Sequence, residues 1–262
     1  MKFMVLSIFP ELFDPFLQYG IVGRAVKEGK ISLSILNIRD FTEDKHRTTD
    51  DRPYGGGCGM VMKPEPLVAA IRAVQEREPA SRKILLTPQG RTFSQEMARS
   101  FAACEGFTLV CGRYEGIDER VMHGFIDEEI SIGDFILTGG ELAAMMIIEA
   151  VARLIPGVLG GEDSADKDTF SERLVEHAQY TRPPVFEGQA VPEVLRSGNH
   201  KEIEQWRMEA SMIRTFLKRP DLLENRRFNQ QEIDVLKKWR GDIDRIIKAQ
   251  SVSGAAALPG SR

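Results

Sequence analysis

The sequence predicts an α/β protein, with a mostly parallel sheet covered by helices and followed by a small, mainly helical C-terminal domain. From residue 1 to 155, short apolar runs alternate with longer segments in which apolar residues recur every three or four positions. Residues 199–218 and 232–248 carry the helical period without strands between them. Residues 156–170, rich in glycine and polar side chains, have the composition of a linker between these two regions.

The strands and helices of the first region follow from local patterns. The 3–8 run is apolar and ends before Pro10, and 30–38 alternates apolar and polar residues, as in a strand with one polar face. Gly29 ends one helix, and Pro64 occupies the tolerated first turn of another. We expect strands at 3–8, 30–38, 83–87, 107–111 and 129–132. We expect helices at 15–28, 64–78, 93–104, 117–124 and 142–153, the last almost wholly buried.

Three glycine-containing loops follow predicted strands. They are T-P-Q-G at 87–90, G-R-Y-E-G at 112–116 and G-D-F-I-L-T-G-G at 133–140. Because the carboxyl ends of parallel strands meet at one edge of a sheet, the loops are expected to form one cleft. Glycines let a ligand approach the backbone, and Phe135 and Ile136 add apolar walls, which suits a nucleoside better than a free phosphate. A tight strand-to-helix turn explains 131–141 equally well when that stretch is taken alone.

Residues 39–62 form a long irregular segment, and such segments are usually either functional or disordered. The glycine run at 55–59 is not a P-loop, because no Gly-Lys-Ser/Thr follows it. Arg47, Arg52 and Tyr54 are candidates for contacts with a polyanion, and a plain surface loop fits the same residues.

Composition narrows the class of protein. The chain has 262 residues, of which 42% are hydrophobic and 28% charged, which is enough for a sizeable core. No apolar run is long enough to span a bilayer and the N-terminus does not resemble a secretory signal, so a cytoplasmic protein is expected. The chain has three cysteines and no C-x-x-C pair, which argues against disulfides and against structural zinc. Cys104 and Cys111 are expected in the core.

The C-terminal domain begins with an extended stretch and continues as helices. Asn199 followed by Glu202 is a capping-box variant that starts the 199–218 helix. Its buried face is predicted from residues at helical spacing, namely Ile203, Trp206, Ala210, Ile213 and Leu217. Basic residues slightly outnumber acidic ones over 171–248, although the whole chain has a formal net charge of −4.

Taken together, the motifs resemble one family. They are D-R-P-Y-G-G-G-x-G-M-V-M at 51–62, T-P-Q-G at 87–90, C-G-R-Y-E-G-I-D-E-R at 111–120, S-I-G-D-F-I-L-T-G-G-E at 131–141, D-T-F at 168–170, Y-T-R-P at 180–183 and S-G-N-H-x-x-I-x-x-W-R at 197–207. From residue 1 to about 248 the sequence resembles the bacterial tRNA (guanine-N1)-methyltransferases, the TrmD family of the SPOUT superfamily. The number and order of the motifs carry the resemblance, because each alone is weak.

The resemblance implies a SPOUT-type parallel sheet with a deep trefoil knot made by the loops near residues 86–140. It implies a knotted catalytic domain at 1–159, a flexible interdomain linker and lid at 160–170, a helical tRNA-binding domain at 171–248 and a disordered tail at 249–262. It also implies a homodimer whose active sites are shared between subunits.

The resemblance further implies S-adenosylmethionine as the methyl donor, held by the three loops. The implied cofactor-binding residues are Thr87, Pro88, Gly90, Gly112, Tyr114, Glu115, Ile132, Gly133, Asp134, Phe135, Ile136, Leu137, Thr138, Gly139 and Gly140. The family is also linked with Mg²⁺, although no ligand cluster in this sequence identifies a metal site.

The implied reaction methylates N1 of guanosine 37, immediately 3′ of the anticodon in tRNA. Guanine N1 carries a proton, so a base must remove it, and Asp168 matches the family's general base. Arg153 matches the arginine that faces the charge developing on guanine O6. A cation placed favourably at a helix C-terminus explains Arg153 without the family. The residues implied to face tRNA are Asn199, His200, Trp206, Arg207 and Arg214.

Two other functions make different predictions. A dinucleotide-dependent oxidoreductase needs G-x-G-x-x-G after the first strand, but the chain continues F-P-E-L-F-D after Ile8. A non-catalytic RNA-binding module with the same fold is expected to lack Asp168 or the knot glycines, and both are present. The methyltransferase is therefore the function that the sequence favours.

Overall fold

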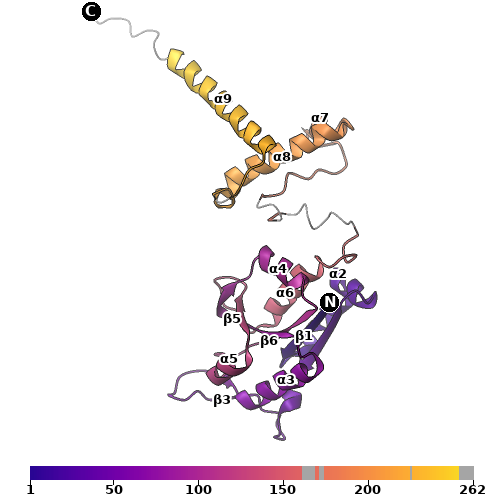
Figure 1. The fold of residues 1–262 in the computed structure, drawn as a ribbon, viewed down its shortest axis with the longest axis vertical. Helices are drawn as coiled ribbons and strands as arrows, with labels where there is room; N and C mark the ends of the chain where they lie inside the picture. The colour runs from indigo at the N-terminus through magenta and orange to yellow at the C-terminus, as the bar shows by residue number, and fades with distance from the viewer. Residues whose placement is uncertain (161–168, 171–173, 225, 254–262) are drawn as a thin grey trace, which may run out of the picture. The chain divides into compact units, whose positions relative to one another are not determined.

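The computed structural model describes residues 1–160, 169–170, 174–224 and 226–253, with side chains as far as residue 249. Contacts divide the chain into two compact units, Met1–Ala165 and Asp166–Arg262, each described by itself below. The N-terminal unit holds the large sheet, and the C-terminal unit, orange to yellow in Figure 1, is built mainly from helices.

The N-terminal unit is organised around a five-stranded parallel sheet. Its order is β2 (Ser32–Asn37), β1 (Lys2–Ser7), β6 (Gly106–Cys111), β5 (Arg82–Thr92) and β7 (Glu128–Ser131). All neighbouring strands run parallel. β1 and β6 lie inside the sheet with nearly every residue buried, which explains why their sequences are continuous apolar runs.

In the described part of the N-terminal unit, six α-helices accompany this sheet, and the helices of the two faces bury two separate clusters. They are α1 (Asp14–Gln18), α2 (Gly20–Lys27), α3 (Pro64–Arg77), α4 (Gln95–Ala102), α5 (Glu119–Phe125) and α6 (Glu141–Ala152). One cluster takes its helix residues from α2, α4 and α6, the other from α3 and α5. Along β1 the side chains alternate between clusters, as the two-residue period of a strand requires.

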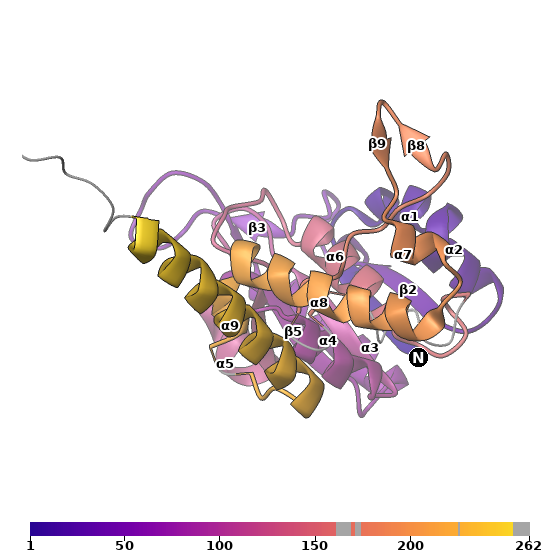
Figure 2. The same cartoon turned by 90° about the horizontal axis from the view of Figure 1, so that it is seen from above.

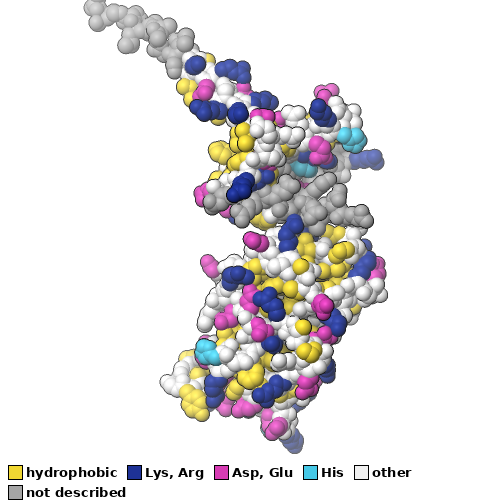
Figure 3. All heavy atoms as spheres, in the orientation of Figure 1, with side chains coloured by type: hydrophobic (Ala, Val, Ile, Leu, Met, Phe, Trp, Pro, Cys, Tyr) yellow, Lys and Arg dark blue, Asp and Glu magenta, His cyan; other side chains and the backbone are white. Residues whose placement is uncertain are grey.

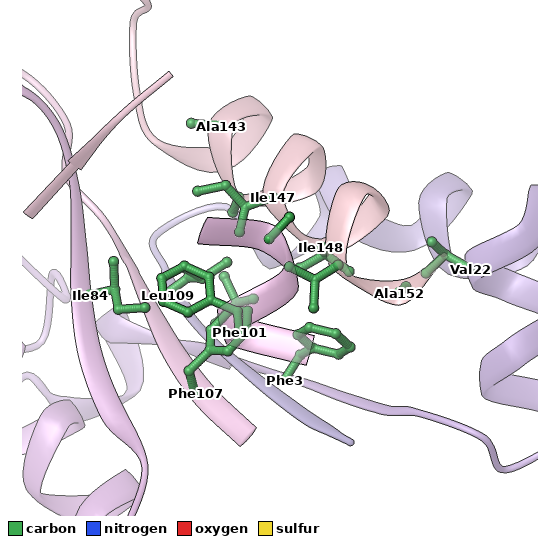
Figure 4. Close-up of a cluster of buried hydrophobic side chains, with 14 of the residues drawn as sticks. Phe3, Val22, Ile84, Phe101, Phe107, Leu109, Ala143, Ile147, Ile148 and Ala152 are labelled. Atoms are coloured by element: carbon green, nitrogen blue, oxygen red, sulfur yellow. The ribbon is translucent and has the colours of Figure 1, made fainter. Parts of the chain in front are cut away.

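Aromatic rings fill the centre of the first cluster. Figure 4 shows Phe3, Phe101 and Phe107 together beneath Ile147 and Ile148 of α6. The ring centroids of Phe3 and Phe107 are 5.2 Å apart, edge to face, and those of Phe101 and Phe107 are 5.0 Å apart. This core fixes α6 against the sheet.

Two sequence predictions for this unit are wrong in their bounds. The helix expected at 15–28 is two helices, because Tyr19 is extended and Gly20 has φ of +72°, which stops α1 and restarts the chain as α2. The strand expected at 83–87 continues to Thr92, since Arg91 and Thr92 pair again with β7. The other predicted strands and helices of this region match within two residues at each end.

The helix at 142–153 is less buried than predicted. It begins at Glu141 and its core face is fully buried, but Leu142 and Met146 are 58% and 53% exposed. These two apolar side chains are one helical turn apart and share a face. Among the described residues, these two apolar side chains stay largely uncovered, and the same exposed face also carries Glu149.

The irregular segment at 39–62 is anchored at its end. It contains a short 3₁₀ helix, Ile38–Phe41, and a small antiparallel pair, β3 (Asp50–Asp51) with β4 (Val61–Met62). The Met62 N–H donates to the Gly116 carbonyl at 2.9 Å, which ties the segment to the 112–116 loop.

The C-terminal unit has a short hairpin and helices, seen from above in Figure 2. The hairpin joins β8 (Val185–Phe186) to β9 (Gln189–Ala190). The helices are α7 (Glu193–Arg196), α8 (His200–Lys218), a 3₁₀ turn at Pro220–Leu222, and α9 (Gln230–Ser253). Residues 249–253, expected in the tail, are thus helical, and 254–262 lie outside the described residues.

In the part of the chain that the structure describes, no helix is long and apolar enough to cross a membrane.

The cap of α8 is confirmed, and its predicted buried face is half-buried at Ile203, Trp206 and Ala210 but wrong at its C-terminal end. The Asn199 side chain accepts a hydrogen bond from the Glu202 N–H. The fully buried residues are Met212 and Thr215, whereas Ile213 and Leu217 are 43% and 72% exposed. The reason is a polar contact that periodicity does not report: the Thr215 hydroxyl accepts from the Val175 N–H at 2.8 Å and turns that side of α8 inward.

A buried ion pair stabilises the start of α9. The Arg226 guanidinium contacts both oxygens of Glu232 at 2.7 and 2.9 Å, and the two side chains are only 9% and 4% exposed. The Asn229 N–H also donates to Glu232, and the Asn229 side chain accepts from the Glu232 N–H, as in a capping box. Burial raises the pKa of Glu232, but the hydrogen bonds from Arg226 and Asn229 and the Arg226 charge outweigh it and lower the pKa below 4.5.

Glu232→Gln is expected to destabilise the C-terminal unit by about 3–5 kcal/mol, because it removes the negative charge that faces a buried guanidinium. The stabilisation is fully present above the unfolded-state pKa near 4.5 and is lost as the pH falls through the lower folded-state pKa. Urea unfolding from pH 7 to pH 3 measures both effects. The wild type should lose stability more steeply than the variant, with Glu224→Gln, at an exposed site, as the control. Parallel pH profiles would contradict this role.

Candidate active-site cleft

A cleft of about 490 Å³ opens beside residues 85–89 of β5 and the ends of β6 and β7. This volume lies in the range of small-molecule sites. The cleft is lined by Leu85, Leu86, Thr87, Pro88, Gln89, Gly112, Arg113, Tyr114, Glu115, Gly116, Ile117, Glu119, Met122, Ile130, Ser131, Ile132, Gly133, Phe135, Ile136, Leu137, Thr138, Gly139, Gly140 and Ala143. The three glycine-containing loops therefore meet in one place.

The first loop is an excursion from β5. Leu86 and Arg91 both neighbour Ile130 of β7, so residues 87–90 leave the ladder between them. Glu128, 15% exposed, binds Arg82 at 2.6 Å and Arg91 at 3.1 Å, and thus contacts one arginine on each side of the excursion. A Cβ on Gly90 would lie 2.4 Å from the Ile130 nitrogen, so only glycine fits there.

The second loop follows β6 and rests on the 55–62 segment. Tyr114 has φ of +62° and Gly116 φ of +132°, which turn the chain sharply. The Glu115 N–H donates to the Met60 carbonyl at 3.0 Å. Gly59 has φ of +88°, and a Cβ there would lie 2.3 Å from the Glu115 carboxylate. The glycine segment therefore supports the wall of the cleft that carries Glu115.

The third loop joins β7 to α6. Gly133 has φ of +141°, and the Phe135 ring packs directly against it. Ile136 beyond it is 80% exposed. The Gly140 N–H donates to the Gly112 carbonyl at 2.9 Å, and a Cβ on Gly140 would lie 2.8 Å from the Cys111 Cα. The second and third loops are thus in backbone contact.

A charged pair lies between these two loops. Arg113 Nε is 3.3 Å from the Glu141 carboxylate, and the guanidinium carbon lies 4.4 Å from the centre of the Phe9 ring. Burial raises the pKa of the Cys111 thiol well above its usual value, and the Glu141 charge raises it further. Cys111 therefore stays protonated and is not a nucleophile. Cys104, expected in the core, is only half-buried.

Most of the residues predicted to bind a cofactor line this cleft. They are Thr87, Pro88, Gly112, Tyr114, Glu115, Ile132, Gly133, Phe135, Ile136, Leu137, Thr138, Gly139 and Gly140. Gly90 packs behind the first loop against the backbone of β7, and neither it nor Asp134 is among the lining residues. Residues outside that prediction also line the cleft, among them Gln89, Arg113 and Met122, and the place of Arg113 within the 111–120 motif was the signal that could have pointed to it.

The two predicted catalytic residues are not seen together. Arg153 is the residue that follows α6; its N–H donates to the Glu149 carbonyl at 3.3 Å, its side chain is half-buried, and it does not line the cleft. Asp168 lies outside the described residues. Among the residues that are described, no group of three His, Cys, Asp or Glu side chains is arranged to hold a metal ion.

The predicted tRNA-facing residues lie along α8. Asn199 and His200 are exposed at its start. Trp206 is half-buried, with ring centroids 6.2 Å from His177 and 6.3 Å from Tyr180. Arg207 pairs with Glu204 at 2.7 Å, and Arg214 Nε is buried without a hydrogen-bond partner among the described residues. Trp206 is thus mainly a packing residue that leaves part of its surface open.

Comparison with known proteins gives a consistent result. A family model described as tRNA (Guanine-1)-methyltransferase TrmD matches residues 1–225. A protein of Desulfatibacillum aliphaticivorans is 54% identical over 262 residues, all of both chains. One of Geobacter sulfurreducens is 54% identical over 236 residues, 90% of this chain and 96% of that one, and one of Marinomonas sp. strain MWYL1 is 51% identical over 239 residues, 91% and 96%. All three relatives bear the name tRNA (guanine-N(1)-)-methyltransferase.

Proposed function

Because the chain belongs to the TrmD family of tRNA (guanine-1)-methyltransferases, we propose that it methylates N1 of guanosine 37, immediately 3′ of the tRNA anticodon. The observation that carries the proposal is the family match, which spans both the cleft and the whole of α8. The chain is accordingly a methyltransferase enzyme, and the proposal concerns its donor, its target nucleotide and its residues. Its substrate tRNA gives it a cytoplasmic site of action.

S-adenosylmethionine is the proposed methyl donor, and the cleft suits it. Glycines in the lining, among them Gly112, Gly133 and Gly139, let a ligand approach the backbone closely, and Ile132 and Leu137 add apolar surface. Such a wall recognises an adenosine by its edges and its faces without a charged anchor. When bound, the sulfonium supplies an electrophilic methyl group. Among the described residues, no group of three His, Cys, Asp or Glu side chains identifies a site for the Mg²⁺ ion that the family resemblance implies, and the proposed steps below are carried by side chains of this chain.

Asp168 is the proposed general base and Arg153 the proposed cation. Guanine N1 becomes nucleophilic only as its proton leaves, and a carboxylate within hydrogen-bond reach accepts that proton. Negative charge then develops on O6, and a guanidinium aimed at it stabilises the transition state. The support is the D-T-F motif at 168–170 and the place of Arg153 at the end of the helix that starts in the cleft. In this scheme 160–170 is a lid between the catalytic domain at 1–159 and the tRNA-binding domain at 171–248.

The proposed tRNA contacts are Asn199, His200, Trp206, Arg207 and Arg214. Figure 3 shows basic and acidic side chains intermingled over the visible surface, without one broad basic patch. Affinity is expected to come from phosphate contacts of the arginines among these residues and from the shape of the tRNA. Sequence recognition in RNA usually targets unstacked bases, which suits a target in the anticodon loop.

A homodimer with shared active sites and a deep trefoil knot are further parts of the proposal. The exposed apolar pair Leu142 and Met146 on α6 supports a subunit contact, because α6 begins at the cleft. The knot is proposed from the family alone, and the three loops in which it is expected, 87–90, 112–116 and 133–140, line the same cleft.

The proposed function is tested with a matched pair of tRNA transcripts. The purified chain is incubated with methyl-labelled S-adenosylmethionine and an unmodified transcript that has guanosine at position 37, or one that has adenosine there. Label is expected only in the first transcript, and nuclease digestion should release it as N1-methylguanosine. Equal labelling of both transcripts, or no labelling although the cofactor binds, would refute the proposed target.

A further inference from the structure

Glu141 is a carboxylate buried beneath the cleft. It is the first residue of α6 and is 1% exposed. The hydroxyl of Ser7, fully buried at the end of β1, is 2.7 Å from Glu141 Oε1. That hydroxyl oxygen also accepts from the Phe9 N–H at 2.9 Å, so its single proton is donated to Glu141. The end of β1 is thereby joined to the start of α6.

The second partner of Glu141 is Arg113, whose side chain is 21% exposed. The Arg113–Glu141 ion pair also packs against the backbone of the third loop. A Cβ on Gly139 would lie 2.5 Å from both Arg113 Nε and Glu141 Oε2. Arg113 and Gly139 are in addition neighbours in an antiparallel backbone bridge. The Glu141 carboxylate thus forms an ion pair with one cleft-lining residue, Arg113, and packs against another, Gly139.

We propose that Glu141 is a positioning residue for methyl transfer. Through Ser7 and Arg113 it fixes the second and third cleft loops against the end of β1. This inference rests on the proposed function of the same cleft. A buried ion pair is weak evidence for stability, since apolar residues of similar volume often serve equally well. The ion pair matters here because it fixes the geometry of the cleft, which Arg113 and Gly139 both line.

The test uses Glu141→Gln, Ser7→Ala and a control, Glu76→Gln, at an exposed site on α3. Glutamine keeps the shape of the side chain but removes the charge that holds Arg113. Ser7→Ala removes the hydrogen bonds that the hydroxyl makes with Glu141 and with the Phe9 N–H, leaves the ion pair in place and is the milder change. Each variant is assayed at a temperature at which its melting curve shows it folded, for the Kd of S-adenosylmethionine and for kcat with tRNA.

Glu141→Gln is expected to weaken S-adenosylmethionine binding and to lower kcat/KM by about 100-fold, the scale for a displacement of about 1 Å in an active site. Ser7→Ala should change both in the same direction by about tenfold. Glu76→Gln should match the wild type. If either cleft variant melts earlier but keeps the wild-type Kd and kcat/KM while folded, the role is only structural and the inference fails. A wild-type chain that neither binds the cofactor nor methylates tRNA would instead refute the proposed function.

Discussion

Gly90→Ala is expected to remove nearly all methyl transfer, by at least about 100-fold in kcat/KM, because a Cβ at this position has no space. It would lie 2.4 Å from the Ile130 nitrogen and 2.5 Å from the Glu129 carbonyl carbon. Both atoms belong to the backbone of β7, so no side chain can turn away to relieve the contact. Either β7 separates from β5, or the 87–90 excursion shifts into the cleft. Both movements disturb the proposed cofactor site.

Calorimetry with S-adenosylmethionine, steady-state kinetics and a melting curve measure this effect. Gly124→Ala is the matched control, because nothing lies within 4 Å of the Cβ that it adds to α5. Alanine favours a helix over glycine by about 0.5–1 kcal/mol, so the control should melt no earlier than the wild type. Gly90→Ala with wild-type binding and kinetics would show that the β5–β7 contact is not needed to shape the cleft.

Asp168→Asn is expected to lower kcat by about 10²–10⁴-fold, the usual contribution of a general base. Asparagine keeps the size of the side chain but cannot accept the proton from guanine N1. The Kd of S-adenosylmethionine should stay unchanged, because Asp168 belongs to none of the three cleft loops. The residual rate should rise with pH more steeply than that of the wild type, since N1 then loses its proton to the solvent.

Rapid-quench kinetics across a pH series, with Asp166→Asn as the control from the same acidic segment, separate these effects. Mixing the Asp168→Asn chain with a cofactor-binding variant adds a test of shared sites, because heterodimers should regain part of the activity. A normal rate for Asp168→Asn, or a loss that follows weaker cofactor binding, would mean that another group takes the proton.

Much of the fold follows from local sequence, because its signals are short in range. The apolar runs of β1 and β6, the Asn199 cap and the three strand-end glycine loops all depend on residues close together in the chain. The break at Gly20 was missed because the apolar period continues on both sides of a single left-handed residue. Periodicity alone cannot report such a local reversal of the backbone.

The features that sequence patterns missed depend on long-range contacts. Ser7 and Glu141 are 134 residues apart, and no spacing rule connects them. The extension of β5 to Thr92 depends on the pairing of Arg91 with Ile130, the residue with which Leu86 also pairs. The inward side of α8 is set by Val175, which belongs to another segment. The cleft was therefore predicted in its outline, whereas the groups that hold its walls became visible only in three dimensions.

In the excursion from β5, the shape of the cleft wall is independent of the pairing of the strands, whereas in most loops the two are linked. The chain leaves and re-enters the sheet beside the same residue, Ile130. Glu128 forms ion pairs with Arg82 before the interrupted part of the ladder and with Arg91 after it. Lengthening or shortening residues 87–90 would therefore leave the pairing of each strand section in register. Substitutions at Thr87, Pro88 or Gln89 are therefore expected to reshape one wall of the cleft and to leave the sheet that carries it unchanged.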